Sequence, residues 1–400
     1  MDDRLDLGGR IRGLRGKLLS QRELADRAQV SVDLIRKLEQ GRRHTASIGS
    51  LQRIARALDV SIVELLGKPA PPPSPDPMAG VVAIRRALTP VDDLLDMDVI
   101  ESAPLTLEEA ERTVTYLWGA YWAGRYELLS TLLPTALMHL RATCRAVASA
   151  ERPRAAHALA RAYQAAGDTL VHLGHQDAGF LAVREALRAA LDSDDALLFA
   201  AMRVSVAWQL LVQGRYEESE RVAVVAARDV EPHGDSSESE LSAFGILSVT
   251  AATAAARAQK RDSARDLLAQ AGEMAGRLGY DRADHQTTFG PAKVAMLAVD
   301  VAVVTDDFPE ALRAAKAMPR DAVLPLATRA RHLADVALAQ LRVGRDDQAL
   351  HTVLTMEQLA PDWIKYQTLP RQVVGELVER ERRVSTPLRE LALRIGAVSR

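Results

Sequence analysis

The chain has 400 residues, of which 48% are apolar and 26% charged. This composition is typical of soluble globular proteins and excludes a disordered chain, and the length predicts two to three domains at about 150 residues each. The formal net charge is −2, but three Lys and eleven Arg against six Asp and three Glu give residues 1 to 68 a charge of +5, which leaves −7 for the remainder.

Cysteine content and hydropathy bear on the compartment. The single cysteine, Cys144, excludes an internal disulfide framework and any zinc site with two or more thiolates. The segment Met1 to Arg10 lacks the basic and apolar regions of a secretion signal. The apolar window Leu197 to Val212 contains Arg203 and Gln209 and falls short of the roughly 20 apolar residues that cross a bilayer. We therefore expect a soluble protein of the reducing cytoplasm.

Capping signals divide residues 8 to 66 into five short predicted helices. Ser20 opens a capping box and Ser61 opens another, whereas Ser31 caps the third helix. Gly41 suits the left-handed residue that ends this third helix. The predicted helices are Gly9 to Lys17, a second after Ser20 through Ala28, Val32 to Gln40, Ser47 or Ser50 to Leu58, and a last turn from Ser61.

The third of these helices is predicted to project from a small core. Only two residues separate it from the second helix, so the two cross sharply. An element one helix wide that carries Arg36 and Lys37 on its outer face fits a DNA major groove, where Arg or Lys donates to guanine. The whole outer face is Val32, Asp33, Arg36 and Lys37, and the loop expected to face phosphates is Arg42, Arg43 and His44. The expected core is Leu24, Ala25, Val30, Ile35, Leu38, Leu51, Ile54, Ala55, Leu58, Ile62 and Leu65.

The stretch from Leu24 to Arg43 resembles the DNA-binding domain of the Cro and lambda-repressor family, also called Xre-type. The resemblance implies that Gln21 contacts phosphate, that the outer face of the third helix contacts base edges, and that Arg15 and Glu39 form an internal ion pair. Gln29 stands where this family usually has Gly, and the turn before Ser20 lacks Gly. The expected DNA contacts are Gln21, Arg22, Ser31, Val32, Asp33, Arg36, Lys37, Arg42, Arg43 and His44.

Two questions remain open at this interface. Asp33 either interacts with the helix dipole at the helix N-terminus or accepts a hydrogen bond from cytosine N4. For Arg36 and Lys37, the alternative to DNA contact is a solvated helix face. One head reads few base pairs, and domains of this kind usually bind as dimers to half-sites about 34 Å apart. We therefore expect a homodimer on double-stranded operator DNA.

A proline-rich stretch separates the head from the rest of the chain. Residues 67 to 77 contain six prolines, which fix φ and remove backbone donors, so that neither helix nor sheet continues through them. The predicted domains are a helix-turn-helix DNA-binding domain over 1–67, a linker over 68–79, and a helical sensor and dimerisation domain over 80–400.

The remainder shows helical periodicity without strand alternation and contains internal repeats. Gly124-Arg125-Tyr126-Glu127 recurs as Gly214-Arg215-Tyr216-Glu217, and looser versions occur between other helical stretches. The repeats resemble the tetratricopeptide class of α-solenoid, with steps longer than its usual period of about 34 residues; an irregular helical bundle is the alternative. We expect an all-α fold. The turn anchors are Gly124, Gly174, Gly214, Lys260, Asp306 and Gly344.

This body also resembles the repeat domains fused to Xre-type heads in actinobacterial regulators, and more distantly the peptide-sensing regulators of Gram-positive bacteria. The motifs are Phe289-Gly290-Pro291, Leu333 to Ala337 and Leu359-Ala360-Pro361. Peptide sensors clamp the ligand backbone with Asn, and this chain has none. A peptide effector would need Gln in that role, and the candidates are Gln164, Gln209, Gln213 and Gln340.

Candidate effector sites fall in two places. Trp208 with Gln209 is one, for which core packing is the alternative, and the polar loop 280–289 can cover a groove or simply connect two helices. The candidate residues are Trp208, Gln209, His285, Gln286 and Phe289. His172 and His175 are three apart, but the sequence sets no thiol or acidic partner for them, so we expect no metal site and no cofactor.

Enzyme motifs are missing from the sequence. It contains no glycine-rich phosphate loop, no His-Glu-x-x-His and no Gly-x-Ser-x-Gly, and Cys144 lies in an Ala-rich stretch where an inert buried thiol is usual. We therefore expect a transcription regulator, not an enzyme, whose body responds to a small molecule, a peptide or a protein partner. The alternative is an interaction scaffold whose head is only a docking module.

Overall fold

A computed structural model divides the chain into two compact units, a head over residues 1–76 and a body over residues 77–400. The structure describes residues 7–15, 19–43, 46, 48–58, 77–90, 102–319, 322, 324–381 and 385–397. The predicted fifth head helix, from Ser61, lies outside these residues, and so does the predicted linker up to residue 76. Each unit is described by itself.

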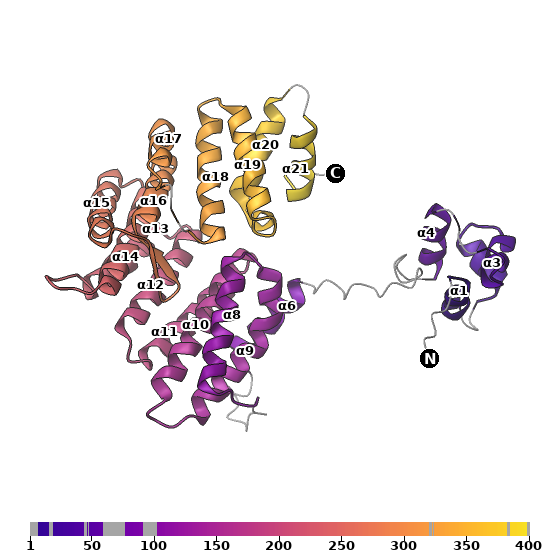
Figure 1. The fold of residues 1–400 in the computed structure, drawn as a ribbon, viewed down its shortest axis with the longest axis horizontal. Helices are drawn as coiled ribbons and strands as arrows, with labels where there is room; N and C mark the ends of the chain where they lie inside the picture. The colour runs from indigo at the N-terminus through magenta and orange to yellow at the C-terminus, as the bar shows by residue number, and fades with distance from the viewer. Residues whose placement is uncertain are drawn as a thin grey trace. The chain divides into compact units, whose positions relative to one another are not determined.

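The head contains the four described helices α1 (Leu7–Arg15), α2 (Gln21–Arg27), α3 (Val32–Glu39) and α4 (Ile48–Ala57) (Figure 1). The predicted caps are confirmed: the Ser20 hydroxyl accepts from the Glu23 amide in a capping box, and the Ser31 hydroxyl accepts from the Leu34 amide at 3.2 Å. The fully buried predicted core residues are Leu24, Ala25, Ile35, Leu38 and Ile54, with Leu51 and Ala55 nearly so. Val30 and Leu58 are half-buried.

The body is built from antiparallel helix pairs (Figure 1). Its first helix begins at Pro77, three residues before the predicted boundary, since proline is well tolerated in the first turn of a helix. Its described elements are α6 (Pro77–Leu88), α8 (Leu107–Trp122), α9 (Tyr126–Ala146), α10 (Arg152–His172), α11 (Gln176–Leu191), α12 (Ala196–Val212), α13 (Tyr216–Asp229), α14 (Glu238–Arg257), α15 (Arg261–Leu278), β1 (Arg282–Asp284), β2 (Thr287–Phe289), α16 (Pro291–Val304), α17 (Phe308–Lys316), α18 (Leu326–Arg342), α19 (Asp346–Leu359), the 3₁₀ turn η1 (Trp363–Tyr366), α20 (Thr368–Arg380) and α21 (Thr386–Ile395).

The same left-handed turn joins the two helices of six successive pairs, from α8 and α9 to α18 and α19. In the first, Gly124 has φ of +71° and the Arg125 amide donates to the Ala120 carbonyl at 3.0 Å, which is the Schellman ending of a helix. At the predicted anchor Lys260 the positive φ falls one residue earlier, on Gln259. The left-handed residues are Gly124, Gly174, Gly214, Gln259, Asp306 and Gly344. These turns make the body a helical repeat that resembles a TPR-like solenoid.

A two-stranded hairpin interrupts the helices, contrary to the expectation of no strand. β1 and β2 are antiparallel, with Arg282 opposite Phe289 and Asp284 opposite Thr287. Each strand has three residues, too few to establish a period of two in the sequence. The tip of this hairpin is His285 and Gln286, both with positive φ.

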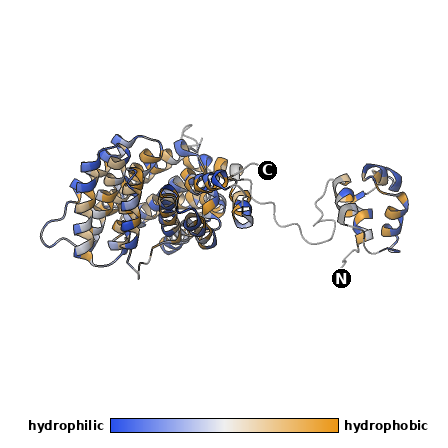
Figure 2. Cartoon of the chain, turned by 90° about the horizontal axis from the view of Figure 1, so that it is seen from above, coloured by the Kyte–Doolittle hydropathy of each residue, from blue (hydrophilic) through white to orange (hydrophobic). Residues whose placement is uncertain are grey.

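The last helices of the body pack against the first ones. Trp363 of η1 packs beside Gly124, and the Tyr366 hydroxyl donates to the Glu127 carboxylate at 2.8 Å across 239 residues. Helix α18 also contacts α8. The hydrophobic core therefore runs without a break from α6–α12 to α18–α21. Figure 2 shows apolar and polar residues alternating around the helices, as this packing requires.

One described helix, α14, is long and apolar enough by composition to match a membrane span, a helix that the sequence analysis did not single out. Within that span 72% of the window is buried inside the body. The core helix of a soluble protein has the same properties, so this single match is weak support for a membrane segment.

Candidate nucleic-acid interface

Helix α3 presents charge outward and apolar side chains inward. Ile35 and Leu38 are fully buried, whereas Asp33, Arg36 and Lys37 are exposed and Val32 is half-buried. Because positions three and four apart share one face of a helix, burial of the first pair turns the other residues toward solvent. The structure therefore brings the four predicted base-facing residues onto one accessible surface.

The two cations of this face differ in their partners. The Lys37 ammonium pairs with the Asp33 carboxylate at 2.7 Å, and hydrogen bonding to Lys37 lowers the pKa of Asp33. Both side chains are half or more exposed, so this pair contributes little to stability and is readily exchanged for other partners. Arg36 has no ion pair with any residue that the structure describes. Its guanidinium is available to a groove or a phosphate.

The flanks of α3 carry the other predicted contacts. Gly41, with φ of +65°, turns the chain after α3, and Arg42 and Arg43 follow it with exposed side chains. Arg22 is exposed on α2, and Ser31 is exposed with its hydroxyl used as the N-cap of α3. His44 lies outside the described residues.

A buried ion pair fixes α3 to α1, as the family resemblance implied. The Arg15 guanidinium donates two hydrogen bonds to Glu39, at 2.8 and 3.1 Å, and the Gln21 amide donates a third at 2.7 Å. Burial raises the pKa of Glu39, but these hydrogen bonds outweigh it and leave the pKa lowered. Gln21, which was expected to contact phosphate, thus donates one hydrogen of its side-chain amide to Glu39. The second amide hydrogen can donate to another acceptor.

The turn between α2 and α3 is left-handed at Gln29. Its φ is +50°, and the Val30 amide donates to the Ala25 carbonyl at 3.0 Å. An L-residue other than Gly, Asn or Asp pays about 1–2 kcal/mol for this conformation. Gln29 in place of the family's usual Gly therefore leaves the turn between α2 and α3 intact but raises the conformational free energy of that turn.

The predicted effector residues of the body lie in separate places. The Trp208 ring lies 5.5 Å from the His172 ring and is tilted by 43° to it, whereas His285 at the hairpin tip contacts Asp195, the N-cap of α12. Residues 195 and 208 are about 20 Å apart along a helix. Phe289 is fully buried in the core against Gly245.

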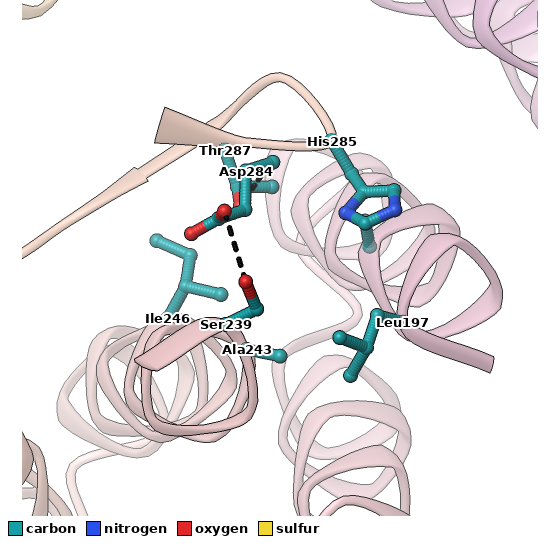
Figure 3. Close-up of a pocket in the computed structure, with 8 residues that line it drawn as sticks. Leu197, Ser239, Ala243, Ile246, Asp284, His285 and Thr287 are labelled. Carbon is teal, nitrogen blue, oxygen red and sulfur yellow. Dashed lines mark hydrogen bonds between the residues drawn. The ribbon is translucent and has the colours of Figure 1, made fainter. Parts of the chain in front are cut away.

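A small pocket beside the hairpin has His285 in its lining. It is lined by Leu197, Ser239, Ala243, Ile246, Asp284, His285 and Thr287, with Ala201 (Figure 3). Its volume of about 10 Å³ is close to the room that one water molecule needs. Ser239 donates to Asp284 at 3.3 Å across it. The pocket is too small for an organic effector in this arrangement.

A polar cluster that the sequence analysis did not assemble lies between α10 and α12. Gln164 donates to Ser205 at 3.0 Å, and Ser205 donates to Asp168 at 3.2 Å. Burial raises the pKa of Asp168 to about 7. The Gln209 carboxamide is fully buried there, beside Asp168. The spacing of Gln164, Asp168 and His172 on one face of α10 was the available signal.

The histidines His172 and His175 and the single cysteine have defined surroundings in the body. His172 lies beside Tyr121 and Gln367, whereas His175 lies beside Arg85, so this pair does not converge on one point. Burial lowers the pKa of His172 to about 3. Burial raises the pKa of Cys144 to about 11, which keeps it a thiol at neutral pH.

Known proteins resemble this chain at two levels. Residues 11–65 match the sequence model of the family described as Helix-turn-helix. A solved structure of Pseudomonas aeruginosa pilF is 15% identical and covers 65% of this chain and 98% of its own, with a TM-score of 0.35. Bacillus thuringiensis PlcR, solved with the peptide PapR7 and DNA, is 15% identical and covers 68% of this chain and 95% of its own, with a TM-score of 0.32. No curated protein matches the chain. Residues 11–65 thus form a helix-turn-helix domain of the Xre type.

Proposed function

We propose that this protein is a sequence-specific transcription regulator of the cytoplasm, which acts by binding and not by catalysis. It binds operator DNA as a homodimer, and its body responds to a small-molecule, peptide or protein effector. The observation that carries the proposal is the outward face of α3 in a helix-turn-helix domain, where Arg36 is exposed and without an ion pair among the described residues.

The charge of the head supports DNA as the partner. Residues 1 to 68 carry +5, and DNA affinity depends on the release of counterions from neutralised phosphates. If each half-site neutralises three or four phosphates, a dimer has a slope of log K against log salt of roughly −5 to −7.

Control by an effector needs a body with two arrangements. An effector shifts such an equilibrium only if it binds one arrangement better than the other. The small volume of the pocket in Figure 3 agrees with an arrangement that does not hold an effector.

Gel-shift titration of the full chain tests the DNA-binding proposal. The probe is the region upstream of the protein's own coding sequence, and a pool of random duplexes supplies the operator if that region is not bound. Arg36→Ala is expected to weaken specific binding by about 5-fold to 150-fold, since one good base contact is worth about 1–3 kcal/mol. Lys37→Ala is expected to weaken it less.

Arg265→Ala is the matched control, because it removes an exposed guanidinium from α15 in the body. Unchanged, salt-insensitive binding by the Arg36 and Lys37 variants would rule out the regulator and favour the scaffold. Deletion of residues 78–400 is expected to weaken operator binding by removing the dimer. Sedimentation of the isolated head as a stable dimer would contradict this assignment of the dimer contacts.

A further inference from the structure

Two imidazoles and a carboxylate converge where the β1–β2 hairpin meets the helices. His157 lies on α10, Asp195 caps α12, and His285 is at the hairpin tip. The His285 Nε2 is 2.8 Å from the Asp195 Oδ2, the His157 Nε2 is 3.7 Å from the same oxygen, and one ligand atom from each residue lies within 4.8 Å of the others. Elements far apart in sequence thus aim their ligand atoms at one point.

The spacing suits a metal ion. Zinc bonds to His and carboxylate are about 2.0–2.2 Å long, so the ligand atoms of a tetrahedral site are about 3.3–3.5 Å apart. The two distances to Asp195 Oδ2 lie on either side of this range. The two imidazole nitrogens are within 4.8 Å of each other, so they approach by up to about 1.5 Å when the site forms. Partly exposed side chains make such shifts by rotation about their own bonds.

The carboxylate is already oriented for this role. Asp195 Oδ1 accepts hydrogen bonds from the Leu197 and Leu198 amides at 3.0 and 2.9 Å, which leaves Oδ2 facing both imidazoles. Such outer hydrogen bonds orient ligands in metal sites. The side chains of His157 and Asp195 are about one-third exposed, at 32% and 31%, and that of His285 is 18% exposed. Water can therefore complete the coordination.

We propose that His157, Asp195 and His285 bind a divalent first-row transition-metal ion, Zn²⁺ foremost, which fastens the β1–β2 hairpin to α10 and α12. Two imidazoles and one carboxylate are ligands of the kind that such ions prefer. The positive charge of Arg161, one turn from His157, disfavours a cation here. The negative charges of Glu111 and Asp195 offset it. The hairpin tip is also held by the Trp122 indole, which donates to Gln286 at 3.4 Å. The site goes beyond the proposed function and involves no residue of the head.

Cobalt titration of the full chain tests the site. The protein is purified without a histidine tag, treated with EDTA and titrated with Co²⁺, whose visible absorption reports tetrahedral ligation, and Zn²⁺ is then added as a competitor. We expect one Co²⁺ per chain, displaced by one Zn²⁺. His285→Ala, His157→Gln and Asp195→Asn are each expected to weaken binding about tenfold or more.

Two features of the design keep the outcome clear. Asp195→Asn retains an oxygen for the N-cap and His157→Gln keeps a polar side chain, so both are expected to fold, which circular dichroism checks. His233→Gln removes an exposed imidazole elsewhere in the body and is expected to bind Co²⁺ as the unaltered protein does. Absence of saturable binding, or equal binding by the three ligand variants, would overturn the metal site and leave the DNA-binding proposal untouched.

Discussion

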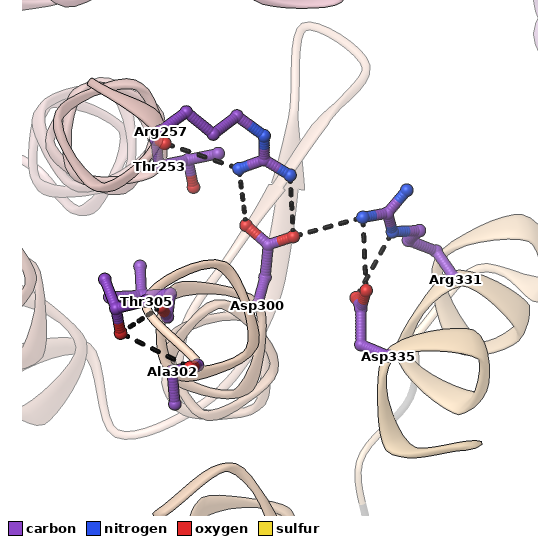
Figure 4. Close-up of polar contacts among 8 residues, drawn as sticks. Thr253, Arg257, Asp300, Ala302, Thr305, Arg331 and Asp335 are labelled. Atoms are coloured by element: carbon purple, nitrogen blue, oxygen red, sulfur yellow. Dashed lines mark hydrogen bonds and ion pairs between the residues drawn. The ribbon is translucent and has the colours of Figure 1, made fainter. Parts of the chain in front are cut away.

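The head and the body both join helices through buried ion pairs, but they use them differently. In the head, the pair of Arg15 and Glu39 joins α1 to α3, with exposed fractions of 15% and 3%. In the body, Arg257 pairs with Asp300 at 2.9 Å, Arg331 pairs with the same Asp300 at 3.1 Å, and Arg331 also pairs with Asp335 (Figure 4). This chain of charges joins α14, α16 and α18.

The difference shows what each unit does with its arginines. The head pairs Arg15 internally and leaves Arg36 on its surface. The body turns Arg257 and Arg331 toward a carboxylate that is only 6% exposed. Burial raises the pKa of Asp300, but the two guanidinium groups outweigh this effect and lower it to about 2. Charge in the head is thus kept for a partner, whereas charge in the body holds the angle between successive helix pairs.

The largest effect is expected from breaking the charge chain. Asp300→Ala leaves two arginines in the body without their shared partner, and removal of one member of a buried pair typically costs about 3–5 kcal/mol. Urea unfolding followed by tryptophan fluorescence measures this cost, because all four tryptophans of the sequence lie in the body. Asp262→Ala breaks an exposed pair with Arg265 and serves as the control. Equal urea midpoints for Asp300→Ala and Asp262→Ala would show that the buried ion pairs of Asp300 do not stabilise the body.

A smaller effect is expected from the polar cluster. Asp168 has a pKa of about 7 in the folded protein against about 3.9 in an unfolded chain. The folded state therefore holds a proton between pH 4 and 7 that the unfolded state has released, and the free energy of unfolding falls as the pH rises through this window. Asp168→Asn removes this fall and stabilises the body at pH 8 by up to about 4 kcal/mol.

Urea midpoints from pH 4.5 to 8 measure the effect on Asp168. Asp177→Asn, an exposed change on α11, is expected to keep the pH profile of the unaltered protein. A profile of Asp168→Asn parallel to that of the unaltered protein would mean that Asp168 is charged throughout and that burial does not govern its titration.

The smallest effect is expected from exchanging the turn residues of head and body. Gln29→Gly relieves a left-handed residue and is expected to stabilise the head by about 0.5–1 kcal/mol, measured as thermal unfolding of residues 1–76 by circular dichroism. Gly174→Ala does the reverse in the body at a cost of about 1 kcal/mol. A Cβ at Gly174 meets no atom within 4 Å, so the cost is one of backbone conformation alone. A gain in stability for Gln29→Gly and a loss for Gly174→Ala would confirm that the turn of the head is strained and that of the body is not. Changes of the same sign would contradict this comparison.

Local signals in the sequence predicted the parts of the fold that local chemistry decides. Ser20 and Ser31 mark helix starts, Gly124 and Gly214 mark turns between helices, and both kinds of signal span only a few residues. Gln259 was missed as a left-handed residue because its side chain gives no sign of that conformation. The meeting of His157, Asp195 and His285 depends on how three distant elements pack. The spacing of these three residues in the sequence therefore does not predict that their side chains meet.

The contact between η1 and the first helix pair has a consequence for the whole repeat array. In an open solenoid each repeat contacts only its neighbours, so damage spreads one repeat at a time. Here the Tyr366 and Glu127 contact spans 239 residues and joins η1 to the first helix pair. Loss of η1 would therefore uncover the turn at Gly124 and remove the partner of Glu127, more than 200 residues earlier in the chain.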